Sequence, residues 1–152
     1  MAVYLLDTNI LLRLVDVKTA QHALVREAIE TLLGRQDRIV LVPQVLYESW
    51  VVATRPNTHN GLGWDAARVH QEIVLLRERF ELLFDLPEVF SNWLELVSAH
   101  EVLGKQAHDA RLVAAMQAHG VEHLLTLNSE DFKRYQEITP VHPSEVTNEH
   151  DT

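Results

Sequence analysis

Three short, mostly apolar segments are separated by long stretches with helical periodicity, and this alternation limits the possible folds more than any other feature of the sequence. The segments are residues 3–6, 39–42 and 124–127, which are rich in leucine, valine and isoleucine. Apolar runs of this length are typical of strands that are buried on both faces. Parallel strands need long crossover connections, which are usually helices. The sequence therefore predicts an α/β fold with helices on both faces of a central, mostly parallel sheet.

The segments between these runs show apolar residues at helical spacing. The spacing predicts helices over residues 20–33, 43–53, 64–80, 87–103 and 106–118. Short strands are expected at residues 81–85 and 137–141, the second of them at an edge of the sheet. We expect a single domain over residues 1–143 and a polar C-terminal tail over residues 144–152.

The composition excludes several kinds of site. The chain has 152 residues, enough for one domain with a sizeable core, and it has no cysteine. Disulfides, thiolate metal sites and a cysteine nucleophile are therefore excluded, and any metal ion must bind to oxygen or imidazole. The net charge of −9 disfavours long-range attraction of nucleic acid, unless a divalent cation neutralises carboxylates gathered at one site. Without a long apolar run or an export signal, we expect a cytoplasmic protein with no membrane contact.

Acidic and amide side chains fall where the predicted strands end or the following helices begin. They are Asp7, Glu48, Asp109, Asn128 and Asp131. The carboxyl ends of parallel strands share one edge of a sheet, where α/β proteins bind their ligands. A single acid in such a place is most often a helix cap or a solvated residue, but four acids at equivalent places indicate a site. Gathered carboxylates repel one another unless a hard cation such as Mg²⁺ or Mn²⁺ is bound among them.

A site of this kind suits the hydrolysis of phosphate esters. Bound divalent cations activate a water molecule, polarise the phosphate and stabilise the leaving oxygen, so no protein nucleophile is needed. Glu48 is the most informative of the acids, because apolar residues surround it in the sequence. A half-buried glutamate without a partner would be costly, so its position indicates a role.

Four segments around these residues resemble the successive motifs of the PIN domain family. They are LLDTNILLR at residues 5–13, PQVLYE at 43–48, HDARLVAAM at 108–116 and LLTLNSEDF at 124–132. Their order and spacing match the family over nearly the whole chain. Within the family, the sequence resembles the VapC group, the single-domain ribonuclease toxins of bacterial type II toxin–antitoxin pairs.

The resemblance implies a three-layer α/β/α nuclease domain that acts as an Mg²⁺- or Mn²⁺-dependent endoribonuclease. It implies that Asp7, Glu48 and Asp109 are catalytic acids that bind the metal ion. Many relatives carry a further acid where this chain has Asn128, so we expect Asn128 and the catalytic acid Asp131 to complete the metal site. The partners that it implies are an RNA substrate, a cognate antitoxin that covers the acid pocket, and a second copy of the chain in a homodimer.

Other polar residues near the motifs have two open interpretations. Beside the acids are Thr8, Asn9, Thr126, Asn128 and His108, and the nearest basic residues are Arg13, Arg55, Lys105 and Arg111. The first group either orients carboxylates and assists proton transfer, or only satisfies backbone groups at strand ends. The basic residues either bind the phosphates of RNA or keep the surface soluble, and Arg55 and Lys105 are the stronger candidates for phosphate binding.

Two other classes of function are open at this point. A PIN-like binding module without catalysis would explain the missing fourth acid, and it predicts weak Mn²⁺ binding and no turnover. A phosphatase or receiver-like domain that handles phosphate also has an acid pocket at the end of a parallel sheet. However, Asp7-Thr8-Asn9 lacks the second aspartate of the usual Asp-x-Asp pair, and the second predicted strand leads into Pro43 instead of an aspartate. The phosphate-handling class is therefore the less favoured of the two.

Overall fold

A five-stranded parallel sheet forms the centre of the protein. The computed structural model describes the backbone of residues 1–150 and the side chains of residues 1–148. The strands are β1 (Val3–Leu6), β2 (Arg38–Leu41), β3 (Glu81–Leu82), β4 (His123–Leu125) and β5 (Thr139–Val141), in the order β3-β2-β1-β4-β5. Every strand pairing in this part of the chain is parallel. The predicted α/β class is confirmed, and the sheet is wholly parallel.

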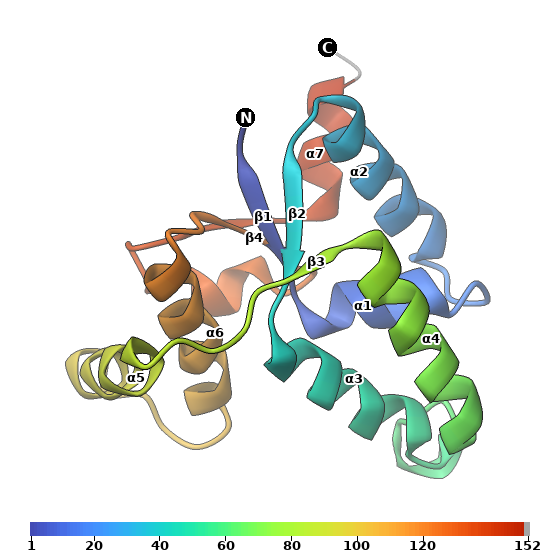
Figure 1. The fold of residues 1–152 in the computed structure, drawn as a ribbon, viewed down its shortest axis with the longest axis horizontal. Coiled ribbons are helices and arrows are strands. Elements are labelled where there is room, and N and C mark those ends of the chain that lie inside the picture. Colours follow the sequence, from blue (N-terminus) through green and yellow to red (C-terminus); the bar gives the residue numbers. More distant parts are fainter. Residues whose placement is uncertain (151–152) are drawn as a thin grey trace.

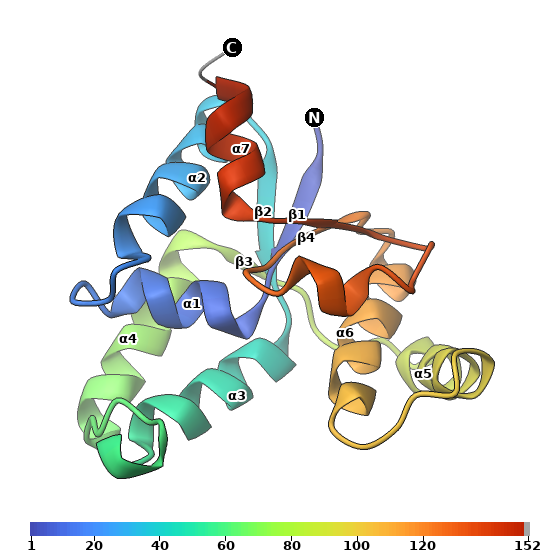
Figure 2. The same cartoon turned by 180° about the vertical axis from the view of Figure 1, so that it is seen from behind.

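Helices cover both faces of this sheet. They are α1 (Thr8–Val15), α2 (His22–Gly34), α3 (Pro43–Thr54), α4 (Ala66–Arg79), α5 (Glu88–Ala99), α6 (Gln106–His119) and α7 (Pro143–His150), with the 3₁₀ turns η1 (Asn57–His59) and η2 (Ser129–Phe132). In Figure 1, α5 and α6 lie to one side of the sheet and α1, α2, α4 and α7 to the other, and Figure 2 shows the same division from behind. This arrangement confirms the expected three-layer architecture. None of these helices is long and apolar enough to cross a membrane.

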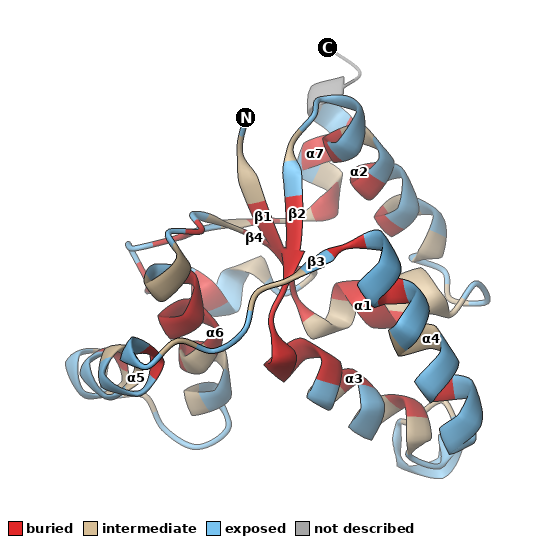
Figure 3. Ribbon diagram, viewed as in Figure 1, coloured by how far each residue is buried: buried red, intermediate tan, exposed pale blue. Residues whose placement is uncertain are grey.

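The central strands are buried on both faces (Figure 3). Leu5, Leu6, Val40 and Leu41 are fully buried. Successive side chains of a strand point to opposite faces of the sheet, so burial of neighbouring residues requires a cover on each face. The two helical layers provide that cover, which explains why the strand sequences are continuously apolar and do not alternate with polar residues.

Local sequence signals fix several helix ends, two of them at the carboxyl edge of the sheet. Pro43 is the first residue of α3, where its missing N–H is not needed. Asp7 is the N-cap of α1, a helix that the sequence prediction omits, and its side chain accepts a hydrogen bond from the N–H of Thr8. Gly120 ends α6 in the left-handed conformation, with φ of 69°. These caps hold the first turns of α1 and α3 directly after the strands β1 and β2.

Two segments differ from the sequence prediction. Helix α5 ends at Ala99, well before residue 103, and Glu101 then adopts a left-handed φ of 48°. Residues 144–150, expected to be a polar tail, belong to helix α7, which packs against α2. Val146 and Thr147 are buried in this contact, and such a short apolar face gives no clear periodic pattern in the sequence. Residues 151–152 of the expected tail lie outside the described residues.

Candidate functional site

Asp7 lies where β1 ends and α1 begins, and hydrogen bonds hold both oxygens of its carboxylate. Its Oδ1 accepts a 2.7 Å hydrogen bond from the backbone N–H of Thr8. Its Oδ2 accepts a 2.8 Å hydrogen bond from the hydroxyl of Thr126, which is fully buried, and a 3.4 Å hydrogen bond from the side-chain amide of Asn9. Three of the residues expected to support the acids therefore converge on this one carboxylate.

The same polar residues connect the start of α1 to the end of β4. The Asn9 Oδ1 atom accepts a 3.0 Å hydrogen bond from the backbone N–H of Leu127. The backbone N–H of Asn128 donates to the Thr126 hydroxyl at 3.1 Å, whereas the Asn128 side chain is exposed. The carboxyl ends of the neighbouring strands β1 and β4 are thus joined by side-chain hydrogen bonds as well as by the sheet.

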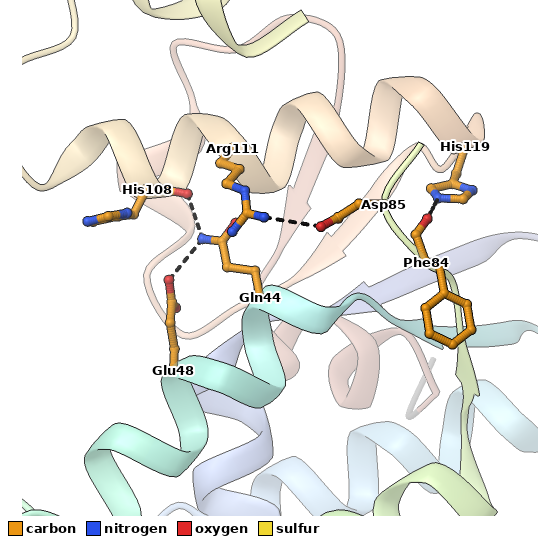
Figure 4. A network of polar contacts seen from close by, with 7 residues as sticks. All are labelled: Gln44, Glu48, Phe84, Asp85, His108, Arg111 and His119. Carbon is orange, nitrogen blue, oxygen red and sulfur yellow. Dashed lines mark hydrogen bonds and ion pairs between the residues drawn. The ribbon is translucent and has the colours of Figure 1, made fainter. Parts of the chain in front are cut away.

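Glu48 lies on α3 and also has a donor on each carboxylate oxygen. The hydroxyl of Thr8 donates to Oε2 at 2.8 Å. The side-chain amide of Gln44 donates to Oε1 at 2.8 Å, and the same Nε2 atom donates to the backbone carbonyl of His108 at 2.8 Å (Figure 4). Glu48 is therefore half-buried but not unpaired, and it is tied to both α1 and α6.

Asp109 lies in the first turn of α6, and the other acids influence its titration. Its pKa is raised to about 6, by burial first and then by the negative charges of Asp7, Asp131 and Glu48. The pKa of Asp7 is also raised to about 6. Burial is the main cause there as well, and the hydrogen bond from Thr126 is the largest opposing effect. The other three acids, which come from other elements, thus lie within electrostatic reach of Asp109.

These acids fit a hard divalent cation in their chemistry but do not form a ready-made ligand cage. Asp7, Glu48, Asp109 and Asp131 offer only oxygen, the donor that Mg²⁺ and Mn²⁺ prefer. No ion pair among the described residues involves any of the four, and the one opposing charge that acts on Asp109 is that of His108, which lowers its pKa. Among the described side chains of residues 1–148, however, no group of three or more His, Asp or Glu is arranged to hold a metal ion.

A groove of about 580 Å³ adjoins two of these residues, Thr8 and Glu48. Three of the four basic residues singled out in the sequence also line it: Arg55, Lys105 and Arg111, together with His108. Arg111 is engaged in a 3.1 Å ion pair with Asp85, which holds its guanidinium in place (Figure 4). Arg13 does not line the groove, because its Nε donates to Gln21 at 2.8 Å near the end of α1.

The site lies in a part of the chain that matches a known protein family. A sequence model of the PIN domain family matches residues 4–138, which is most of the chain. The chain belongs to the PIN domain family. The matched range of this PIN domain contains all five acidic and amide residues of the site. No curated protein sequence matches the chain.

Solved structures with the same fold cover nearly all of this PIN domain. VapBC2 from Rickettsia felis, bound to a DNA fragment from their promoter, has 18% identity and a TM-score of 0.71 over 92% of this chain and 98% of that chain. A toxin–antitoxin complex from Klebsiella pneumoniae has 20% identity and a TM-score of 0.62 over 94% and 98% of the two chains. VapC20 from Mycobacterium tuberculosis, a sarcin-ricin loop cleaving toxin, has 14% identity and a TM-score of 0.65 over 87% and 95%. At these identities the likeness shows a shared fold.

Gln44 is a polar residue of this PIN domain's site that the sequence analysis did not single out. It is buried between α3 and α6, and both of its hydrogen bonds reach residues of the site. Its spacing from Glu48 contains a usable signal, since residues four apart on a helix lie on the same face. That spacing predicts a contact within α3 but says nothing about the contact with His108, because the sequence does not reveal how α3 and α6 pack.

Proposed function

We propose that this PIN domain is an endoribonuclease, the toxin of a type II toxin–antitoxin pair, which acts in the cytoplasm and requires Mg²⁺ or Mn²⁺. One observation carries the proposal: the negative charges of Asp7, Glu48 and Asp131 reach Asp109 at the carboxyl edge of the sheet, beside a groove with three basic residues. Acids gathered in this way attract cations, whereas the basic residues attract the phosphates of an RNA strand. The two groups together suit a phosphodiester substrate.

We assign the cation to Asp7, Glu48, Asp109, Asn128 and Asp131. When bound, the cation would lower the pKa of a water molecule and polarise the scissile phosphate. The hydroxyl of Thr126 and the amide of Asn9 orient the Asp7 carboxylate through the hydrogen bonds described above.

The groove residues of this chain bind and orient the RNA. Arg55 and Lys105 bind backbone phosphates of the RNA. Arg111 also binds a phosphate when its ion pair with Asp85 opens. The exposed side chain of His108 lines the same groove, where its ring nitrogens can form hydrogen bonds with the substrate. Arg13 lies outside this groove, so a phosphate that it binds would lie beyond the groove, toward the end of α1.

RNA cleavage by the purified protein tests the proposal. Total RNA is incubated with the wild type in Mg²⁺ or Mn²⁺, beside an EDTA control and the variant Asp109→Asn. Asp65→Asn is the matched control, because Asp65 is an exposed N-cap of α4 far from the acids in the fold. We expect discrete fragments from the wild type and from Asp65→Asn only. Cleavage that survives both EDTA and Asp109→Asn would refute the assigned site.

A second candidate function, a binding module without catalysis, is favoured by one specific observation. The described residues contain no ready-made group of three metal-ligating side chains, and Asn128 is exposed at the position where the family resemblance implies an acid. This candidate predicts no cleavage of any RNA and negligible Mn²⁺ binding in calorimetry. Mn²⁺ binding that Asp109→Asn abolishes would exclude it even before a target RNA is known.

Exposed apolar side chains support the proposal of protein partners. Phe84, Phe90 and Leu103 are 63%, 67% and 81% exposed, and their burial against a partner would stabilise a complex. We propose that this PIN domain forms a homodimer and that a cognate antitoxin covers the acid groove. The Klebsiella pneumoniae relative, a toxin–antitoxin complex, supports the second partner. Sedimentation velocity tests the first: a monomeric wild type, or a Phe90→Ser variant that remains dimeric, contradicts a dimer through these side chains.

A further inference from the structure

Gln44 connects two walls of the acid groove through a single side-chain nitrogen. It lies in the first turn of α3 and is buried, with 5% of its surface exposed. Its Nε2 donates 2.8 Å hydrogen bonds to the Glu48 carboxylate and to the backbone carbonyl of His108, and the two acceptors belong to different helices (Figure 4). Because a buried amide without partners is costly, the fold holds both contacts in place.

The hydrogen bonds of the Glu48 carboxylate restrict its side chain beyond what the backbone of α3 fixes. A glutamate side chain has several rotatable bonds, and ordering it requires a loss of conformational entropy. Glu48 has one donor on each oxygen, the Thr8 hydroxyl on Oε2 and the Gln44 amide on Oε1. With both donors in place, the carboxylate keeps one position and one orientation, while each oxygen retains a lone pair for a further ligand.

The second hydrogen bond of Gln44 reaches the opposite wall of the groove, which α6 forms. His108 precedes Asp109 in the first turn of α6, so the bond to its carbonyl sets where Asp109 lies relative to α3. A neutral amide suits this position better than a basic side chain. It stabilises the carboxylate by hydrogen bonding without adding a positive charge that would compete with a bound cation.

We propose that Gln44 is a positioning residue, which orients Glu48 and fixes the separation between Glu48 on α3 and Asp109 on α6. The inference rests on the proposed function, in which both acids bind the metal ion. In this role Gln44 acts through the two acids and is not itself a ligand of the metal ion.

The variant Gln44→Met tests this role, because methionine has a similar length and no donor. Gln117→Met, on an exposed position of α6, is the matched control. The affinity for Mn²⁺ is measured by calorimetry, the melting temperature by circular dichroism, and kcat and KM with an RNA that the wild type cleaves. We expect Gln44→Met to lower the Mn²⁺ affinity or kcat about 10- to 100-fold with little change in KM. Gln117→Met should match the wild type in every measurement.

A further comparison separates positioning from a merely structural role. In the background of Glu48→Gln, Gln44→Met should lower the Mn²⁺ affinity much less than it does in the wild type, because residues that act through a shared partner are not additive. If Gln44→Met does not fold, Gln44→Asn replaces it: this variant keeps a buried amide but is one methylene too short to reach both acceptors. We expect the same direction of change for Gln44→Asn.

The outcomes distinguish this inference from the proposed function. If the wild type binds Mn²⁺ and cleaves RNA while the folded Gln44 variant equals it in both, only the positioning role is overturned. A lower melting temperature with unchanged Mn²⁺ affinity and kcat also overturns it, since Gln44 would then be structural. If the wild type neither binds Mn²⁺ nor cleaves RNA, both proposals fall together.

Discussion

Burial makes the negative charge of Asp7 unfavourable. Replacing Asp7 with a neutral residue should therefore stabilise the protein in the absence of metal ions. Burial raises the pKa of Asp7 from its usual 3.8 to about 6. The folded state therefore binds a proton between these pH values that the unfolded state does not bind. Stability is then lost as the pH rises from about 4 through 6, and the loss is complete at neutral pH. The variant Asp7→Asn carries no charge at any pH and escapes this loss.

The size of the expected stabilisation follows from the shift in the pKa of Asp7. A pKa raised from 3.8 to about 6 corresponds to about 3 kcal/mol of unfolding free energy at neutral pH. Asparagine places an NH₂ group where Oδ2 accepts the hydrogen bond of Thr126, and a lost bond of this kind costs about 1 kcal/mol. We therefore expect Asp7→Asn to gain about 2 kcal/mol at pH 7.5 and to lose this advantage near pH 4.

Urea unfolding in EDTA at a series of pH values measures this difference. Asp65→Asn is the matched control, since Asp65 is also an N-cap but is exposed, and aspartate and asparagine are about equally good caps. Its stability should follow that of the wild type at every pH. The reasoning is refuted if Asp7→Asn is no more stable than the wild type at pH 7.5, or if the gain is the same at pH 4. In the same variant, Mn²⁺ should no longer raise the stability.

Three further substitutions test the fold and the groove. Gly61→Ala should lower the unfolding free energy by about 1–3 kcal/mol, because the added Cβ would lie 2.1 Å from the carbonyl oxygen of Arg55; a variant as stable as the wild type in thermal melts contradicts this packing. Phe132→Ala should cost about 3–5 kcal/mol in urea unfolding, since Phe132 is only 1% exposed, and a loss below 1 kcal/mol would show that it is not a core residue. Lys105→Ala should weaken RNA binding and reduce the dependence of log K on log salt by about 0.7 in filter-binding titrations, whereas an unchanged slope would remove Lys105 from the phosphate contacts.

The fold was predictable because its main signals are local. A run such as residues 39–42 indicates a strand buried on both faces, and Pro43 and Gly120 mark helix ends through their backbone chemistry alone. The short helix α7 was missed, since it buries too few residues to give a clear periodic pattern. The short helix α1 was missed although its buried residues Ile10, Leu11 and Leu12 give it a distinct apolar face.

The sequence by itself also determined which kinds of side chain come together at the site. The carboxyl ends of parallel strands share one edge of a sheet. Asp7, which follows β1, therefore had to lie near the residues that follow the neighbouring strands β2 and β4. Only the tertiary structure decided which groups bond there, because those contacts join residues 119 positions apart for Asp7 and Thr126 and 64 apart for Gln44 and His108. Such contacts depend on the angles and distances at which helices and strands pack, and local sequence patterns do not encode them. The same packing buries Asp7 and Asp109 enough to raise their pKa, and it leaves Arg13 outside the groove.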